Sequence, residues 1–469
     1  MTFDFTQQPP KPATLDESHK LIEGLWTFAR HATEKLNLNS ANSSLSPSQE
    51  RFKKTTPQSK KKTSWEKRTL AYWKKRKQGA QQGHKGTGRS LLPRENVDKV
   101  MPCYPGKDCP HCPGTIQVKH ICQRKQVFDL TLKGINVTEY QVYNGRCINC
   151  KKRVKGKLPT GLPRGILTEE SLSKIVLLVA QYRLSRREVK QLLADFFDLH
   201  ICIGTISNAE RLVSEALTNR VDAIGKQVKA ADHAHLDETS HRRSGKTEWL
   251  WVACNDKVSL FKIFDNRAQS SAKALIGEGY KGMTITDRYG AYSFLPPSQR
   301  QYCWAHLKRD FIRISEKLDP KEAYIGECLS QAQRRIFYWY EQLKCDKKSY
   351  ARLLLIRQIK RFYGYLKKGV QLAGTTTARF CAKLLRERKS LWHFLKNSNI
   401  DPTNNLAERN IRHFVLWRKK TFGTRSERGN RFIERMLTVM MTAKQAGENL
   451  IQELCNQLKF NQYGLCNER

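Results

Sequence analysis

Three acidic residues far apart in the chain have the types and the surroundings that a shared metal site would need. Asp237 and Asp287 end short, partly apolar stretches typical of β-strands, and Glu408 lies in the first turn of a later helix. Converging carboxylates repel one another unless cations lie between them, and their hard oxygen atoms suit Mg²⁺ or Mn²⁺. Two such ions about 4 Å apart can activate one oxygen and stabilise another during in-line displacement at phosphorus. The three acids therefore predict phosphoryl transfer that needs no Ser, Cys or Lys nucleophile.

The direction of Glu408 follows from its helical neighbours. Glu408, Ile411 and Val415 are three and seven residues apart, so they share one face of the helix. Ile411 and Val415 should pack on the sheet, which would aim Glu408 at the strand ends. Glu238 follows Asp237 directly and should point to the opposite face of the strand, so we leave it out of the acidic set.

Two C-x-x-C pairs predict a separate Zn²⁺ site. Cys109 and Cys112 form one pair and Cys147 and Cys150 the other, and the alternating stretch between them, 127–143, suits short strands. Each pair fits a tight knuckle, and two knuckles supply four thiolates for tetrahedral zinc. Other side chains near enough to serve as ligands are His111, His120, Cys103 and Cys122.

The charge of the chain indicates a polyanionic partner. Lys and Arg number 85 against 43 Asp and Glu, a net charge of +42. An anionic membrane is the competing partner, but no apolar run reaches the roughly 18 residues that a membrane span needs. The first residues also lack the layout of a secretory signal. We therefore expect a cytoplasmic, nucleoid-associated protein that binds DNA and not membrane.

The elements that must position these side chains are strands and helices in alternating blocks. Strand-like stretches at 249–253, 258–264, 282–287 and 300–303 follow the one that ends at Asp237, and a basic helical region precedes the helix of Glu408. Upstream, 168–220 is predicted to be helical, with N-caps at Thr168, Ser185 and Thr205. Its outline fits a helix-turn-helix and equally an ordinary helical hairpin.

The expected organisation has six parts. They are an N-terminal amphipathic helix (1–40), a basic flexible linker or DNA-contacting arm (41–98), a zinc-binding domain (99–160), a helical segment (161–228), an α/β domain carrying the acids (229–325 and 400–460) and a basic helical insertion (326–399). In the linker, Trp65, Tyr72 and Trp73 alternate with cations. That pattern suits either contact with a phosphate backbone or a solvated tail.

An ordered set of motifs resembles the transposases of the insertion sequence sixty-six family, members of the D-D-E group. Besides the two cysteine pairs, the segments that carry the resemblance are GHKG at 83–86, LDET at 236–239, TDRYGAY at 286–292, CWAHL at 303–307 and NNLAER at 404–409. The resemblance covers nearly the full chain. It implies a multidomain α+β protein whose ribonuclease-H-like catalytic core, with its helical insertion, follows a small zinc-binding domain and the helical segment.

The resemblance also implies an activity. Asp237, Asp287 and Glu408 would be the catalytic acids that hold Mg²⁺, and the protein would cleave DNA at element ends and join it to target DNA. Its partners would be those DNAs, further copies of itself on DNA, and accessory proteins of the same element. Two departures are visible: Arg288 stands where the family usually has Gly, and the family's C-terminal extension is short or absent.

Two other functions compete with this interpretation. One is a zinc-containing DNA-binding protein without catalysis, which the intact set of three acids disfavours. The other is a ribonuclease-H-like nuclease that cleaves without joining. The sequence distinguishes this nuclease from a transposase least well, because hydrolysis and strand transfer would use the same acids.

Overall fold

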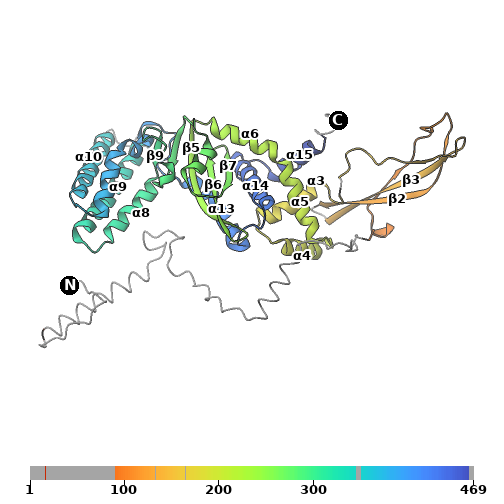
Figure 1. The fold of residues 1–469 in the computed structure, drawn as a ribbon, viewed down its shortest axis with the longest axis horizontal. Helices are drawn as coiled ribbons and strands as arrows, with labels where there is room; N and C mark the ends of the chain where they lie inside the picture. The colour runs from red at the N-terminus through yellow and green to blue at the C-terminus, as the bar shows by residue number, and fades with distance from the viewer. Residues whose placement is uncertain (1–15, 17–89, 132–133, 164, 345–349, 464–469) are drawn as a thin grey trace. The chain divides into compact units, whose positions relative to one another are not determined.

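The computed structural model describes residues 16, 90–131, 134–163, 165–344 and 350–463 (Figure 1). The expected N-terminal helix and nearly all of the basic linker lie outside these residues. The described chain forms two compact units, one of Trp304–Arg388 and one drawn from Thr87–Cys303 and Lys389–Arg469. No helix among the described residues is long and apolar enough to cross a membrane.

The first unit is helical. It contains α8 (Trp304–Ser315), α9 (Pro320–Lys344), α10 (Ala351–Val370) and α11 (Thr376–Arg386). Its core is aromatic: the ring of Phe362 lies 5.6 Å from that of Trp304 and 5.8 Å from that of Phe311. The apolar periodicity of the sequence is therefore used to pack helix on helix.

A five-stranded mixed sheet is the centre of the second unit. Its strands are β5 (His233–Arg243), β6 (Lys246–Cys254), β7 (Ser259–Phe264), β8 (Met283–Thr286) and β9 (Arg300–Tyr302). Their order is β7-β6-β5-β8-β9. The first three strands are antiparallel neighbours, and β8 and β9 run parallel to β5.

Strand β5 continues six residues beyond Asp237, the expected end of the strand. It does so because Ser244 and Gly245 form a two-residue hairpin turn with φ of 49° and 86°, which pairs Arg243 with Lys246. Positive φ at both central positions matches the twist of the flanking strands. The polar stretch after Glu238 concealed this extension, since it lacks apolar alternation.

Helices cover both faces of this sheet. On one face lies α13 (Asn405–Thr421), with the ring of Phe414 5.4 Å from that of His241 on β5. The other face carries α6 (Thr218–Lys229) and α7 (Gln269–Ile276). The helix that bears Glu408 thus packs directly on the strand that bears Asp237.

The outer edge of β7 is hydrogen-bonded by side chains of α14 (Glu427–Ala446). The backbone N–H groups of residues 259, 261 and 263 donate to Thr442 Oγ1 (3.1 Å), Thr438 Oγ1 (3.0 Å) and Glu434 Oε1 (2.6 Å). Four helical residues advance about 6.0 Å and two strand residues about 6.6 Å, so successive pairs stay aligned. The edge strand thereby lacks the unpaired donors that invite aggregation.

The upstream segment is helical, as predicted. It forms α3 (Glu169–Ala180), α4 (Arg186–Phe197) and α5 (Ile203–Ala216). The N-caps at Thr168 and Ser185 are confirmed, because their hydroxyls accept from the N–H groups of residues 171 and 188. The cap expected at Thr205 is wrong. Helix α5 starts three residues earlier, at Ile203, and its N-cap position is Cys202, whose backbone is extended.

A second sheet precedes these helices. It contains β1 (Lys99–Cys103), β2 (Ile116–Thr131), β3 (Gly134–Cys147) and β4 (Arg153–Lys155), with β2 and β3 forming a long hairpin (Figure 1). The hairpin's turn end packs near α3, where its side chains join one hydrophobic core with α3, the mixed sheet and α15 (Leu450–Tyr463). Its open end, at residues 116 and 147, carries the cysteines.

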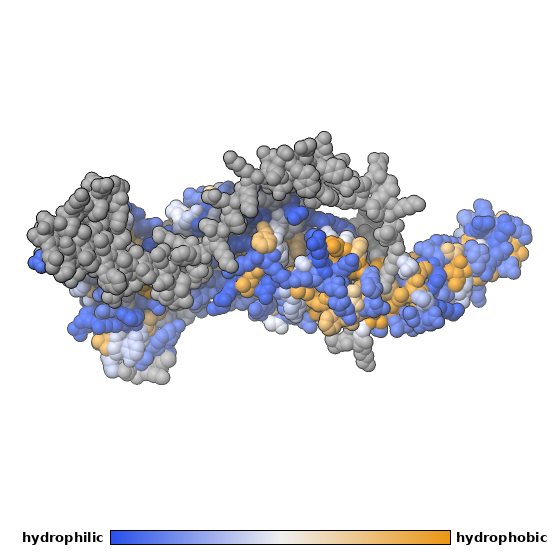
Figure 2. All heavy atoms as spheres, turned by 90° about the horizontal axis from the view of Figure 1, so that it is seen from below, coloured by the Kyte–Doolittle hydropathy of each residue, from blue (hydrophilic) through white to orange (hydrophobic). Residues whose placement is uncertain are grey.

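The fold class is therefore mixed α+β with more than one compact unit. The visible face of the described residues is mostly hydrophilic, and its apolar residues gather in separate patches (Figure 2).

Candidate acidic site and cysteine cluster

Strand pairing brings the segments that carry Asp237 and Asp287 next to each other. Strands β5 and β8 are parallel neighbours, and His235 is paired with Ile285. Asp237 follows His235 by two residues on β5, and Asp287 follows Ile285 by two residues, directly after the end of β8. If the pairing were continued by two residues, the two acids would be level with each other.

Asn404 holds the start of α13 over the same strand. Its Nδ2 donates to the carbonyl of Leu236 at 2.7 Å, and its Oδ1 accepts from His235 Nδ1 at 3.2 Å. The side chain is buried, so both bonds are shielded from water. The first turn of α13, which contains Glu408, is therefore held above β5.

Further along the same pair of elements, His241 on β5 contacts Phe414 on α13. His235, Asp237 and His241 share one face of β5 because they are separated by even numbers of residues. On α13, Glu408 lies between the residues that meet His235 and His241. The face of β5 that bears Asp237 and the first turn of α13, which bears Glu408, therefore approach each other.

Electrostatics are consistent with this convergence. Burial raises the pKa of Asp237 well above its usual range, and the negative charges of Glu238, Asp287 and Glu408 raise it further. All three predicted acids keep part of their surface exposed. Asp237 Oδ1 accepts from the N–H of Glu238 and Asp287 Oδ1 from the N–H of Tyr289, each at 2.9 Å. Carboxylates are the ligands that suit hard divalent cations, and the raised pKa of Asp237 shows that its neighbours' negative charges act on it.

Glu238 belongs to a different network. It is buried on the opposite face of β5, where Arg267 donates to its Oε1 at 2.8 and 2.6 Å and the hydroxyl of Tyr292 donates to its Oε2. The guanidinium of Arg267 also lies 3.9 Å from the centre of the Tyr289 ring. Glu238 thus has a structural role beneath the loop that follows Asp287.

Arg300 was not singled out from sequence, yet it contacts this loop more than any predicted residue does. It is buried on β9, where its Nε donates to Thr286 Oγ1 at 2.8 Å. Its terminal nitrogens donate to the carbonyls of Asp287 (2.7 Å), Tyr292 (3.1 Å) and Tyr289 (3.3 Å). One rigid guanidinium therefore sets the course of the chain at the second acid. No local signal marks it, because a lone Arg in a short strand is unremarkable.

The cysteine cluster lies at the open end of the β2–β3 hairpin. The sulfurs of Cys109, Cys112, Cys147 and Cys150 are within 4.8 Å of one another. Cys109 and Cys150 are 3.6 Å apart at sulfur, and Cys112 and Cys147 are 3.4 Å apart. Tetrahedral zinc with bonds of about 2.3 Å would separate its sulfurs by roughly 3.8 Å. The four cysteines therefore fit a structural Zn²⁺ ion, and the nearby His111, His120, Cys103 and Cys122 are outside the cluster.

The backbone around the second cysteine pair favours the thiolate form of Cys147. The N–H of Cys150 lies 3.5 Å from the sulfur of Cys147 and lowers the pKa of Cys147 to about 6. The pKa of Cys112 is raised to about 12, since Cys147 takes the negative charge of the pair first. Gly114 makes room for the cluster: a Cβ there would lie 2.8 Å from the sulfur of Cys147. Its place two residues after a C-x-x-C pair is a signal that sequence reasoning overlooked.

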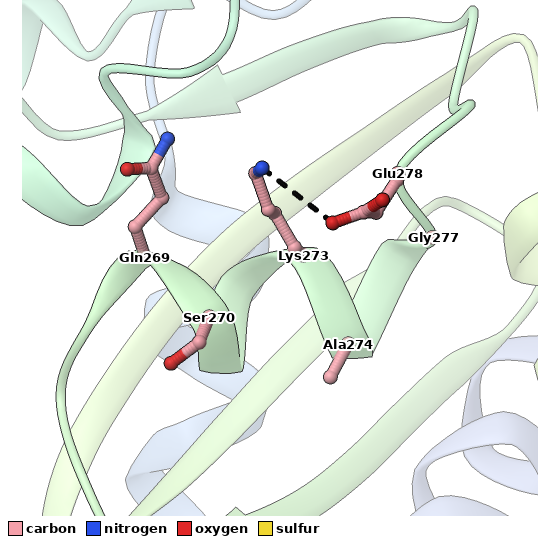
Figure 3. Close-up of a pocket in the computed structure, with 6 residues that line it drawn as sticks. All are labelled: Gln269, Ser270, Lys273, Ala274, Gly277 and Glu278. Atoms are coloured by element: carbon pink, nitrogen blue, oxygen red, sulfur yellow. Dashed lines mark ion pairs between the residues drawn. The ribbon is translucent and has the colours of Figure 1, made fainter.

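A surface hollow of about 620 Å³ lies over α7, away from both groups (Figure 3). Lys273 and Glu278 form an ion pair of 3.5 Å on one side of it. The remaining lining residues are Gln269, Ser270, Ala274 and Gly277. This set has no cluster of ligands and no buried charge, so we assign it no chemistry.

Together these features define a mixed α+β protein with acidic residues on and beside its mixed sheet and a zinc-compatible cysteine cluster. The sequence profile described as "Transposase IS66 family" matches residues 164–431, more than half of the chain. The chain belongs to this family. The matched range includes the three acids and excludes the four cysteines. A profile described as a family of unknown function matches residues 7–90.

A relative in Sinorhizobium fredii, described as "Uncharacterized protein y4qI", is 26% identical over 271 residues. The match takes in 50% of this chain and 49% of the relative. The chain thus matches about half the length of this curated relative, whose description assigns no activity.

Proposed function

We propose that this protein is a DNA transposase that cleaves DNA at the ends of its element and joins the freed 3′ hydroxyl to target DNA. The observation that supports the proposal is that Asp237 on β5, Asp287 directly after β8 and Glu408 on α13 lie near enough for the charges of Asp287 and Glu408 to raise the pKa of Asp237. Membership of the transposase family supports the class of reaction.

The topology supports a ribonuclease-H-like core. Three antiparallel strands are followed by two strands parallel to the first, with acids on the first strand, directly after the fourth and on a covering helix. Between β9 and that helix the chain includes the helical unit of Trp304–Arg388, which overlaps the insertion expected at 326–399 but begins earlier and ends earlier. We also propose that the chain is divided into the six parts expected from its sequence, with the same boundaries.

The residues of the site would act by holding and orienting. Asp237, Asp287 and Glu408 would bind two Mg²⁺ or Mn²⁺ ions, which when bound supply activation of the attacking oxygen and stabilisation of the leaving oxygen. Asn404 would keep Glu408 in place, and Arg300 would keep Asp287 in place, through the hydrogen bonds described above. Zn²⁺ held by the four cysteines would be structural, because all four positions are filled by protein.

The proposed partners are element-end and target DNA, other copies of this chain on that DNA, and accessory proteins of the same element. The net charge of +42 supports DNA as a partner, since phosphate contacts release counterions. Cleavage without joining and DNA binding without cleavage remain the two competing functions.

The test is a cleavage and strand-transfer assay with the element's own terminal repeats and Mg²⁺. Asp287→Asn and Glu408→Gln should each abolish cutting and joining while leaving DNA affinity within about twofold. Asp256→Asn, at an exposed acid of the same unit, is the matched control and should keep activity. Near-normal strand transfer by Asp287→Asn would overturn the mechanism. Cleavage without any joining would favour the nuclease, and binding without cleavage the non-catalytic protein.

A further inference from the structure

The open end of the β2–β3 hairpin is densely basic. We call residues 105–123 and 144–157, which surround the four cysteines, the cysteine tip. It contains eight cations against one acid, Asp108, and all eight are exposed. The cations are Lys107, Lys119, Arg146, Lys151, Lys152, Arg153, Lys155 and Lys157.

Strand pairing concentrates three of these cations on one face. Arg146 on β3 is directly opposite Arg153 on β4, and Lys155 is opposite Asn144. Directly opposed side chains lie about 5 Å apart at Cβ, and alternate residues of a strand about 6.6 Å apart, on the same face. Like charges placed opposite each other destabilise a sheet. The pairing therefore costs stability in the isolated protein.

Outside the cysteine tip, a cation of the β2–β3 hairpin is neutralised by an acidic side chain. Arg124 donates to both carboxylate oxygens of the buried Glu139, at 2.9 and 2.5 Å. Within the described part of the chain, none of the eight tip cations forms an ion pair. Arg146 Nε instead donates to the carbonyl of Lys151 at 2.7 Å, and Lys155 donates to Gln123. These bonds orient the cations without cancelling their charge.

Zinc does not supply this positive charge. A Zn²⁺ ion with four thiolates has a net charge of about −2. Against eight cations and one aspartate, the loaded tip keeps a net charge of roughly +5 on the order of two dozen exposed residues. A surface of this kind is stabilised by a polyanion whose charges are as closely spaced as its own.

We propose that the cysteine tip is a contact surface for the phosphate backbone of duplex DNA. The choice of DNA among polyanions rests on the proposed transposase function. The cations would neutralise successive phosphates, and zinc would keep β3 and β4 paired so that Arg146, Arg153 and Lys155 face the same way. Phosphate contacts carry no sequence information, so the surface holds DNA of any sequence. It would act on binding and not on the acids of the mixed sheet.

The test compares two triple variants of the full-length, zinc-loaded protein. One changes the tip (Arg146→Gln, Arg153→Gln, Lys155→Gln). The control changes three exposed cations of α10 (Arg357→Gln, Lys360→Gln, Lys367→Gln), which alters net charge equally. Affinity for a random-sequence DNA duplex is measured by fluorescence anisotropy over a range of salt. The tip variant should bind at least tenfold more weakly, and its log–log salt slope should fall by about 2 to 3, since each phosphate contact contributes about 0.9. In the control variant, the loss of affinity and the fall in the salt slope should each be less than half of those in the tip variant.

Further measurements separate the proposal from its alternatives. Zinc content and the midpoint of thermal unfolding show whether the tip variant is folded, and the charge-conserving variant (Arg146→Lys, Arg153→Lys, Lys155→Arg) should restore binding. Equal losses in the tip and control variants would overturn the proposal. The proposal would also be overturned if the full-length protein bound duplex RNA or polyglutamate through these cations more tightly than it bound duplex DNA. Asp287→Asn should keep tip-dependent binding, so loss of catalysis and loss of this surface are told apart.

Discussion

Arg300 donates a hydrogen bond of 2.7 Å from Nη2 to the main-chain carbonyl of Asp287. The same side chain binds the carbonyls of Tyr289 and Tyr292, so one buried guanidinium ties β9 to the loop that begins at the second acid. Placement of Asp287 therefore depends on a residue that itself lies outside the acidic cluster.

Replacing Arg300 should loosen this loop. In Arg300→Met three carbonyls lose a charged donor, and each lost bond of this kind costs about 1–3 kcal/mol. Hydrogen exchange of the peptide covering 286–293 should become about 10- to 100-fold faster, and Mn²⁺ binding should weaken. Arg300→Lys keeps the charge and should show a smaller effect. Unchanged exchange in the Met variant would exclude this positioning role.

The hydroxyl of Thr438 should stabilise the sheet edge. Thr438→Val is nearly isosteric but leaves the buried N–H of Phe261 without its acceptor, which should lower the free energy of unfolding by about 1–3 kcal/mol. Chemical unfolding checks this value. Thr438→Ser keeps the hydroxyl and should lose less. A Val variant as stable as the parent would mean that water satisfies the N–H group.

Glu434 should destabilise the fold at neutral pH through its charge. Burial raises the pKa of its carboxyl, even though the N–H of Ile263 and nearby cations lower it. A carboxyl with a raised pKa favours the folded state only when protonated, so its charge costs stability above the folded pKa. Below the unfolded value, about 4.3, this cost is gone.

Glu434→Gln should therefore raise stability at pH 7, because its amide oxygen can still accept from Ile263. The gain over the parent should shrink as pH falls toward about 4.3. Urea unfolding across this range measures the difference. Glu427→Gln, at an exposed ion pair, is the control and should change stability little. A Glu434→Gln gain that grows as pH falls would contradict the assigned pKa direction.

Gly114 should be required for metal binding. In Gly114→Ala the new Cβ would lie 2.8 Å from the sulfur of Cys147 and 3.0 Å from the side chain of Asn149, so the second knuckle must shift. Zinc affinity, measured by competition with a chelator, should fall by at least tenfold. Gly106→Ala is the matched control, because nothing lies within 4 Å of its added Cβ. Equal affinity in both variants would show that the knuckle adapts.

Local chemistry, readable from sequence, determined several features of this protein. The N-caps at Thr168 and Ser185 depend on bonds within one turn, and the two C-x-x-C pairs need only short knuckles and a hairpin between them.

Tertiary structure alone decided how these pieces meet. The pairing of β5 with β8 brings the segments of Asp237 and Asp287 together, and the position of Glu408 depends on α13 packing over β5. Arg300 and Thr438 satisfy backbone groups of segments remote in sequence. Local propensity cannot encode such long-range hydrogen bonds, because each exists only after burial has removed water as the competing partner.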